Sequence, residues 1–225
     1  MSLEIYKTPQ LRIYDERELK RREHAQNILV DMVENGLSNV NKAWNFSRIE
    51  SSMMMPISDM SSAYTDEDIW KLSSEIKEPY ALRAETTSGT YSSIRALYPN
   101  KKQLKLPHCF WQVGKSFRKE PASKASRLRF YEFTQLEFQC LYAEGTLVNY
   151  RDRIIDELAE TIGWLCKSEY RIIESDRLPD YSNSTMDIEV KHGAEWREIA
   201  SISDRTDFEC PNLEIAIGLD RIISI

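Results

Sequence analysis

The stretch Phe110–Phe138, FWQVGKSFRKEPASKASRLRFYEFTQLEF, decides the fold of this chain. Apolar and polar residues alternate with a period of two in residues 110–118 and again in residues 129–138, as they do in β-strands. The linker PASKAS between them is rich in Pro, Ser and Ala, which favours a loop. The stretch therefore predicts two strands joined by a loop.

One face of the predicted hairpin carries a distinctive set of side chains. The residues that share it are Gln112, Gly114, Ser116, Arg118 and Glu120 in the first strand, and Arg129, Tyr131, Phe133, Gln135 and Glu137 in the second. Arginine has a planar fork that suits phosphate, phenylalanine has a face on which a base can stack, and Glu137 could take an ammonium group. The set fits a nucleotide together with an amino acid. An exposed hairpin with ordinary surface salt bridges would have the same alternation.

The pattern FRKE, a loop, then RFYEFTQLE resembles motif 2 of class II aminoacyl-tRNA synthetases, where FRxE is followed by RxxxF and an acidic residue. It is most similar to glycyl-tRNA synthetases built from one kind of chain, although Tyr131 stands where their pattern has arginine. The resemblance implies that Arg118 is catalytic and contacts the α-phosphate and the attacking carboxylate. It also implies an ATP site lined by Arg118, Lys119, Glu120, Arg129 and Phe130, with Phe133 stacked on the adenine.

Two further blocks resemble the same family. LRAETTSG (residues 82–89) is similar to LRPETAQG, with Ala84 in place of proline; Glu85 could also be a helix N-terminal acid stabilised by the dipole. Residues 184–210 resemble the family's pattern of a DIEV strand, a turn and WxExxGIANRTDYDL. Their alternation predicts two antiparallel strands, MDIEV and EWREIASI, joined by KHGA. The resemblance adds Glu198 and Ile199 to the ATP site, with Glu198 as a ligand for Mg²⁺. We interpret Asp187 and Glu189 as solvated strand charges.

The last block, NLEIAIGLDRIISI (residues 212–225), resembles motif 3, a strand that leads through GLxR into a helix. The resemblance implies that Arg221 is the second catalytic residue, lying on the adenine and meeting the γ-phosphate. It also implies that Glu85, Glu137 and Glu214 surround the amino-acid ammonium group, with Ala216 where the family has a serine that helps to hold glycine. The sequence ends four residues after Arg221, so we expect a core without an anticodon-binding domain.

The first part of the chain resembles motif 1 over about residues 15–58. A helix is predicted over residues 15–35, with a capping box of Asp15 and Glu18, an apolar stripe and a stop at Gly36. Residues 43–60 predict one edge strand that ends near Pro56. In the family this motif builds a dimer interface, so a homodimer is expected. We also predict helices over residues 65–76 and 148–169.

Composition restricts the class of protein. The 225 residues, 41% hydrophobic and 29% charged, allow one sizeable core, so residues 1–225 are predicted to be a single catalytic domain. The net charge of −6 argues against a dedicated nucleic-acid-binding module, and we expect tRNA binding to be weak; the run Lys20–Arg22 is interpreted as a solvated helix face. The scattered Cys and His residues make zinc binding improbable and indicate free thiols in a reducing cytoplasm. No apolar run approaches a membrane span of about 20 residues.

We therefore expect an α+β fold: a class II synthetase core with a six- to eight-stranded, mostly antiparallel sheet flanked by helices. The expected function is ATP- and Mg²⁺-dependent activation of a small, glycine-like amino acid to an aminoacyl-adenylate, with possible transfer to tRNA. Two alternatives stay open. One is a synthetase paralogue that aminoacylates a carrier protein or a small molecule. The other is a non-catalytic synthetase-like binding or accessory protein.

Overall fold

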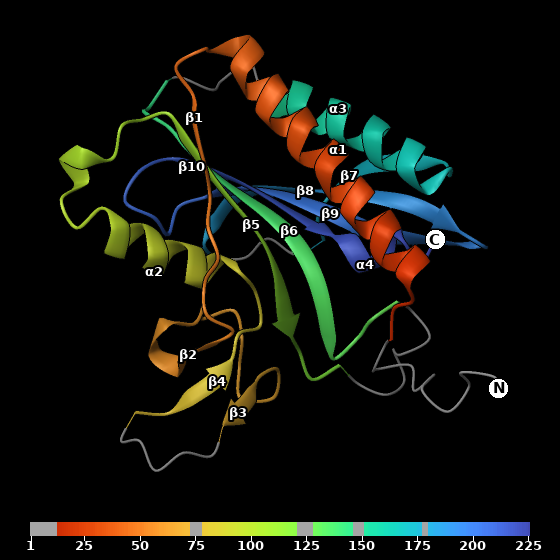
Figure 1. Cartoon of the computed structure of the whole chain (residues 1–225), viewed down its shortest axis with the longest axis horizontal. Helices are drawn as coiled ribbons and strands as arrows, with labels where there is room; N and C mark the ends of the chain where they lie inside the picture. Colours follow the sequence, from red (N-terminus) through yellow and green to blue (C-terminus); the bar gives the residue numbers. More distant parts are fainter. Residues whose placement is uncertain (1–12, 73–77, 121–127, 146–150, 177–179) are drawn as a thin grey trace.

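A computed structural model describes residues 13–72, 78–120, 128–145, 151–176 and 180–225, and its centre is a seven-stranded sheet (Figure 1). The strands lie in the order β1 (Asn45–Arg48), β5 (His108–Phe117), β6 (Glu132–Leu141), β10 (Asn212–Gly218), β9 (Glu195–Arg205), β8 (Ser182–His192) and β7 (Tyr170–Glu174). Only β1 and β5 pair in parallel; every other neighbouring pair is antiparallel. The predicted fold class is confirmed.

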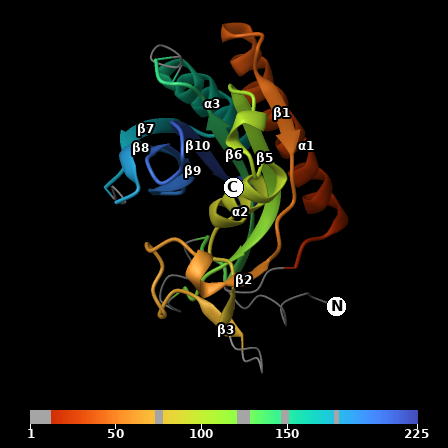
Figure 2. The ribbon, with the colours of Figure 1, turned by 90° about the vertical axis from the view of Figure 1, so that its left-hand side faces the viewer.

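Helices cover both faces of this sheet. Helix α1 (Glu16–Val40) and helix α3 (Arg151–Cys166) lie side by side on one face, whereas α2 (Thr87–Leu97) lies against β5 and β6 on the other (Figure 2). The short α4 (Leu219–Ile222) follows β10 directly. In the described part of the chain, no helix combines the length and the apolar character needed to cross a lipid bilayer.

The two faces of the sheet differ in chemistry because side chains alternate along each strand. On β6, Leu136 and Phe138 are fully buried in the core beneath α1 and α3, whereas Gln135 and Glu137 point to the opposite face. The predicted hairpin pairing is confirmed, with Gln112 opposite Glu137. One face of the sheet is therefore the apolar core, and the other carries the polar groups of the candidate site. The predicted linker, residues 121–126, lies outside the described residues.

Helix α1 begins as predicted but ends later. Asp15 and Glu18 form the capping box, which is confirmed. The predicted stop at Gly36 is wrong: the helix continues to Val40, because Leu37 is fully buried and the packing of its side chain continues the helix. The interpretation of the run Lys20–Arg22 as a solvated helix face is wrong for Arg22. Its guanidinium donates to Thr134 Oγ1 at 3.0 Å and to Asp220 Oδ1 at 3.3 Å. Arg22 thus fastens α1 to α4.

A second, three-stranded sheet was not predicted. It contains β2 (Met54–Pro56), β4 (Tyr80–Leu82) and β3 (Trp70–Leu72), with β4 in the middle. The single strand predicted for residues 43–60 is in fact two strands in different sheets. The helix predicted for residues 65–76 is wrong over residues 65–72: the Thr65 hydroxyl and amide both donate to Asp68 at 2.8 Å, but they close a turn that leads into β3. Residues 73–76 lie outside the described part.

Candidate active site

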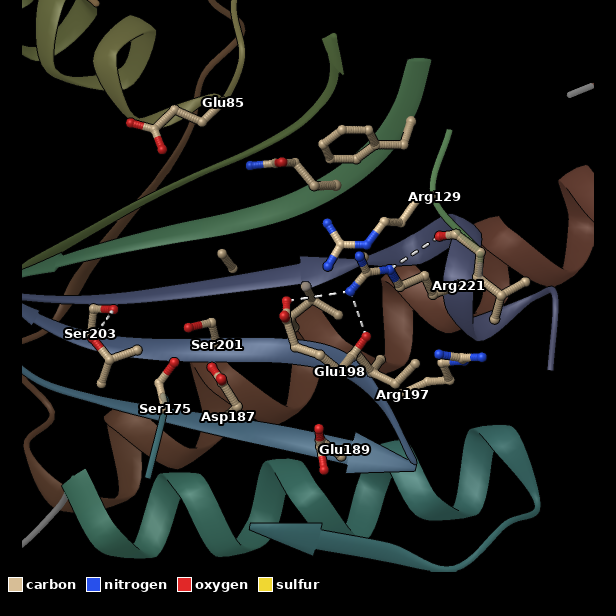
Figure 3. A pocket seen from close by; sticks show the side chains of 18 of the residues that line it. Glu85, Arg129, Ser175, Asp187, Glu189, Arg197, Glu198, Ser201, Ser203 and Arg221 are labelled. Carbon is tan, nitrogen blue, oxygen red and sulfur yellow. Dashed lines mark hydrogen bonds and ion pairs between the residues drawn. The ribbon is translucent and has the colours of Figure 1, made fainter. Parts of the chain in front are cut away.

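A cavity of about 700 Å³ opens on the polar face of the large sheet. Its floor comes from β6, β8, β9 and β10, and Tyr64 and Glu85 approach it from the region of the small sheet. Figure 3 shows Glu85 at one end and Arg129 and Arg221 at the other. The predicted site residues that line the cavity are Glu85, Arg118, Glu120, Arg129, Phe130, Phe133, Glu198, Ile199, Glu214, Ala216 and Arg221.

Arg118 lies in the middle of this arrangement, directly after β5. Its Nε donates to the carbonyl oxygen of Ala84 at 2.9 Å, and its Nη2 donates to the hydroxyl oxygen of Tyr64 at 2.8 Å. Its guanidinium carbon lies 5.1 Å from the ring centroid of Tyr64 and 5.1 Å from that of Phe133. Arg118 is therefore a fixed cation between two aromatic rings, at a distance that permits cation–π attraction.

A second group of cations converges at the far end of the cavity. Arg221, in the first turn of α4, donates to the backbone oxygen of Glu198 at 2.6 Å and to its carboxylate at 3.3 Å. Arg129 lies 3.4 Å from the carboxylate of Glu120. Figure 3 shows the Arg129 and Arg221 side chains at the same end of the cavity. Each arginine has a planar fork of donors that suits phosphate, so this end of the cavity is suited to phosphate.

The opposite end is built from buried carboxylates. Glu214 accepts hydrogen bonds from the Thr87 hydroxyl at 2.7 Å, from Gln139 Nε2 at 2.8 Å and from Arg205 Nη1 at 2.8 Å. Glu85 accepts one from the Tyr64 hydroxyl at 3.0 Å through Oε2. Its other oxygen, Oε1, is buried and makes no hydrogen bond within the described part of the chain. Burial raises the pKa of Glu85, with Glu214 adding to the effect, so this end is suited to a cationic ligand that donates hydrogen bonds.

Two of the predicted site residues, Glu137 and Lys119, do not line the cavity. Glu137 is buried below the floor, where its carboxylate accepts from the hydroxyls of Thr86 and Thr90 and from Gln139 Nε2. Burial and the nearby Glu214 raise its pKa to about 7. The Lys119 ammonium group turns away from the cavity to the backbone oxygen of Asp66, at 3.0 Å. The face on which Glu137 lies follows the strand alternation of β6, but its depth depends on α2 packing above it.

Several residues that shape the site have no role predicted from the sequence. Arg205 is buried, pairs with Glu214 and with Asp207 at 2.5 Å, and stacks on Tyr181 with 3.8 Å between its guanidinium carbon and the ring centroid. Arg83 is also buried, and its Nε donates to the carbonyl of Lys115 in β5 at 2.7 Å. Arg205 begins the sequence RTD, which matches the family pattern quoted for residues 184–210, and this match could have indicated a role for Arg205 in the site. Nothing in the sequence around Tyr64 indicated that it would reach the cavity.

The interpretation of Asp187 and Glu189 as solvated charges on a strand is wrong for Asp187. Asp187, interpreted as a solvated charge, is buried and lines the cavity together with Ser175 and Ser201 (Figure 3). Burial raises its pKa. Glu189 is partly exposed and pairs with Arg171 across β7 and β8. The difference arises because β9 and the residues after β7 cover Asp187, which the strand's own sequence cannot reveal.

The donor set is compatible with Mg²⁺ bound together with a nucleotide. Magnesium usually takes one or two protein carboxylates and completes its shell with phosphate oxygens and water. Glu198 fits this use, since its carboxylate faces the cavity and is about half exposed. No group of three or more His, Cys, Asp or Glu side chains within the described residues could hold a metal ion by itself.

Comparisons with known proteins agree with this geometry. The family model for the tRNA synthetase class II core domain (G, H, P, S and T) matches residues 70–218. A glycine–tRNA ligase of Macrococcus caseolyticus is 35% identical over 145 residues, which are 62% of this chain and 31% of that protein. One from Staphylococcus aureus (strain JH9) is 33% identical over 132 residues, 57% of this chain and 28% of that protein. The chain therefore spans about a third of the length of the curated relatives it matches.

Solved structures of two other proteins share the fold. The cytoplasmic serine–tRNA ligase of Naegleria fowleri, in complex with AMP, superposes with a TM-score of 0.69 at 16% identity, covering 94% of this chain and 54% of that one. The prolyl-tRNA synthetase of Cryptosporidium parvum, complexed with halofuginone and AMPPNP, gives 0.71 at 13% identity, covering 93% and 46%. Since the family match covers about two thirds of the 225 residues, the chain belongs to the class II aminoacyl-tRNA synthetase core family.

Proposed function

We propose that this protein activates a small amino acid with ATP, forming an aminoacyl-adenylate and releasing pyrophosphate. The observation that carries the proposal is the polarity of the cavity: arginines at one end, buried carboxylates at the other, and Arg118 between them. ATP would lie over β6 with its phosphates toward Arg118, Arg129 and Arg221 and its adenine on Phe133. The amino acid would lie between Arg118 and the carboxylates of Glu85 and Glu214.

The chemistry requires positioning rather than a protein nucleophile. One carboxylate oxygen of the amino acid attacks the α-phosphorus, a new O–P bond forms, and the bond from that phosphorus to the bridging oxygen of pyrophosphate breaks. Arg118 neutralises the charge that develops on the α-phosphate and holds the attacking carboxylate in line. When bound beside Glu198, Mg²⁺ would further neutralise phosphate charge. Glu85, whose Oε1 lacks a partner within the described residues, would accept from the substrate ammonium group.

The test is ATP–pyrophosphate exchange with each amino acid in turn. We expect exchange with glycine first and with alanine or serine second, because the buried carboxylates leave little room beside the α-carbon. Arg118→Ala should weaken ATP binding by about 1.5–3 kcal/mol, since it removes charge-assisted contacts to phosphate. Exchange with no amino acid at all, together with ATP binding by calorimetry, would favour the non-catalytic binding protein instead.

The acceptor of the activated amino acid is a separate part of the proposal. The net charge of −6 supports weak, salt-sensitive binding of tRNA, whereas a carrier protein or a small molecule places no such demand on charge. Incubating the protein with radiolabelled amino acid, ATP and either tRNA or candidate carrier proteins separates these acceptors. Tight tRNA binding at physiological salt would contradict the weak-binding expectation.

A homodimer through motif 1 is also proposed. The apolar stripe of α1 packs in the core of the same chain, so the support comes from the position of β1 at the edge of the sheet among the described strands and from the exposed side chains of Met53 and Met54. The mass of one chain is 26.3 kDa, and light scattering at micromolar concentration should give twice that mass. A strictly monomeric mass would contradict the homodimer.

A further inference from the structure

Tyr64 lies between the two charged residues that the proposed function assigns to the amino acid. Its hydroxyl donates to Glu85 Oε2 at 3.0 Å and accepts from Arg118 Nη2 at 2.8 Å. These two contacts join the carboxylate expected to hold the ammonium group to the guanidinium expected to hold the carboxylate. Burial is the largest of several causes that raise the pKa of Tyr64 well above its usual range, so the hydroxyl keeps the proton that it donates.

The segment that carries Tyr64, residues 61–68, is held next to the site by hydrogen bonds from Lys119 and by apolar packing of Tyr64. The backbone amide of Lys119 donates to the carbonyl of Asp68 at 2.9 Å, and the Lys119 ammonium group donates to the carbonyl of Asp66 at 3.0 Å. Tyr64 itself packs against the small cluster formed by Ile69, Ala81 and Ala84. Because Lys119 directly follows Arg118, the segment and the arginine are held in a fixed relation. This accounts for the orientation of Lys119 away from the cavity.

The hydrogen bond from Tyr64 has a consequence for the other oxygen of Glu85. A carboxylate has two oxygens, and Tyr64 occupies Oε2, which leaves Oε1 buried with no hydrogen-bond partner among the described residues. An unsatisfied buried acceptor is unfavourable until a donor reaches it. The contact therefore fixes which oxygen is offered to a ligand, and the phenol ring beside it limits the space on that side of the cavity.

We propose, on the basis of the proposed function, that Tyr64 is a positioning and specificity residue for the amino acid. Its hydroxyl holds Glu85 and Arg118 at the separation that suits the ammonium and carboxylate groups of one α-amino acid. Its ring forms a wall of the amino-acid site and favours the smallest side chains. Tyr64 takes part in no bond-making step.

The experiment uses the full chain and compares wild type with Tyr64→Phe, Tyr64→Ala and the control Tyr80→Phe, whose ring lies on β4 outside the cavity. Pyrophosphate exchange gives KM for glycine and for ATP separately. Loss of the hydroxyl in Tyr64→Phe should raise KM for glycine roughly 10-fold or more, as expected for a hydrogen bond to charged groups, with a much smaller change in KM for ATP. Tyr64→Ala should raise the rate with alanine or serine relative to glycine by roughly 10-fold.

The outcomes separate this inference from the proposed function. Wild-type protein that exchanges with no amino acid overturns the proposed function and the role of Tyr64 with it. Wild-type exchange with an unchanged glycine KM in Tyr64→Phe, or with KM for glycine and ATP rising together, overturns only the role of Tyr64. Unfolding in urea checks that each variant is folded. The alanine-to-glycine ratio is measured within one preparation, so it does not depend on the folded fraction; an unchanged ratio in Tyr64→Ala overturns the specificity role.

Discussion

The two ends of the cavity present opposite charges and are also built in different ways. At the end proposed for the amino acid, the side chains of Arg205 and Glu214 are 1% and 9% exposed, and their ion pair measures 2.8 Å. At the end proposed for the nucleotide, the side chains of Arg221 and Glu198 are 24% and 48% exposed, and their pair measures 3.3 Å. Charges in a buried, low-dielectric place interact more strongly than charges in contact with water.

This difference suits the two ligands of the proposed function. An amino acid as small as glycine offers few atoms, so it can be selected only by groups that are already in place and shielded from water. A nucleotide offers three phosphates and a base, so partly exposed arginines that rearrange around it are sufficient. We therefore expect substitutions at the amino-acid end to affect folding as well as activity, and those at the nucleotide end to affect mainly binding.

The largest effect is expected for Arg205→Ala. Removing this arginine leaves the buried Glu214 without its cation, which typically costs about 3–5 kcal/mol of folding free energy. Arg221→Ala is the matched substitution at the exposed end and should cost less than about 1 kcal/mol. Urea unfolding of both variants measures the difference. Equal losses would show that burial does not make the Arg205–Glu214 pair more important for stability than the Arg221–Glu198 pair.

A second substitution sharpens this test. If the loss in Arg205→Ala comes from the uncompensated charge of Glu214, then adding Glu214→Gln should recover part of the lost stability. If the loss comes instead from the packing of Arg205 on Tyr181, which its 3.8 Å contact permits, the double variant should be no more stable than the single one.

The same contrast explains what the sequence could predict. The β5–β6 hairpin was predicted because its alternation is local, whereas its register, with Gln112 opposite Glu137, is known only from the structure. The small sheet was not predicted because its strands have only three residues each, and β2 and β3 form only by pairing with β4. Short segments of this kind have no periodicity of their own and take their structure from distant partners.

Site residues were predictable to the extent that they lie on strands with a regular alternation. Arg118 and Phe133 could be assigned to the same surface from their spacing, and the resemblance gave them a role. Tyr64 could not, because it meets Arg118 across 54 positions of sequence through an irregular segment. Similarly, the burial of Asp187 and the depth of Glu137 depend on which elements cover them, and a strand's own sequence does not contain that information.

The second expected effect concerns pH and the buried end. The pKa of Glu137 is raised from 4.5 to about 7, mainly by burial and by Glu214. The folded protein thus retains a proton that the unfolded chain loses at lower pH, so the stabilising contribution is complete below the unfolded pKa and is lost as the pH rises to about 7. The gap corresponds to about 3 kcal/mol at most.

Glu137→Gln should remove this dependence. We expect the free energy of unfolding of wild type to fall more steeply than that of Glu137→Gln between about pH 4.5 and 7.5, because other titrating groups are common to both proteins. Glu160→Gln, on the exposed face of α3, is the control for loss of one negative charge. Parallel pH profiles for wild type and Glu137→Gln would mean that Glu137 is already ionised in the folded protein.

The smallest expected effect concerns the amino acid itself. Ala216 lines the cavity on β10, opposite Glu137 on one side and Ser201 on the other. Ala216→Ser adds a hydroxyl that can reach a bound glycine and fills some apolar space, and one such contact is worth about 0.5–1.5 kcal/mol. Discrimination of a single methyl group in a pocket is only about 1–3 kcal/mol, so this change is large enough to shift preference.

We expect Ala216→Ser to raise the ratio of glycine to alanine exchange roughly 2- to 10-fold, in line with that energy, whereas Ala43→Ser, on an exposed segment outside the cavity, should leave it unchanged. Both rates are measured in one preparation, so the ratio reports the pocket rather than the amount of active protein. An unchanged ratio would place the α-carbon of the substrate away from β10. Exchange that peaks with a large or aromatic amino acid would overturn the assignment of the buried end while leaving the fold intact, because the sheet and its helices do not depend on what the cavity binds.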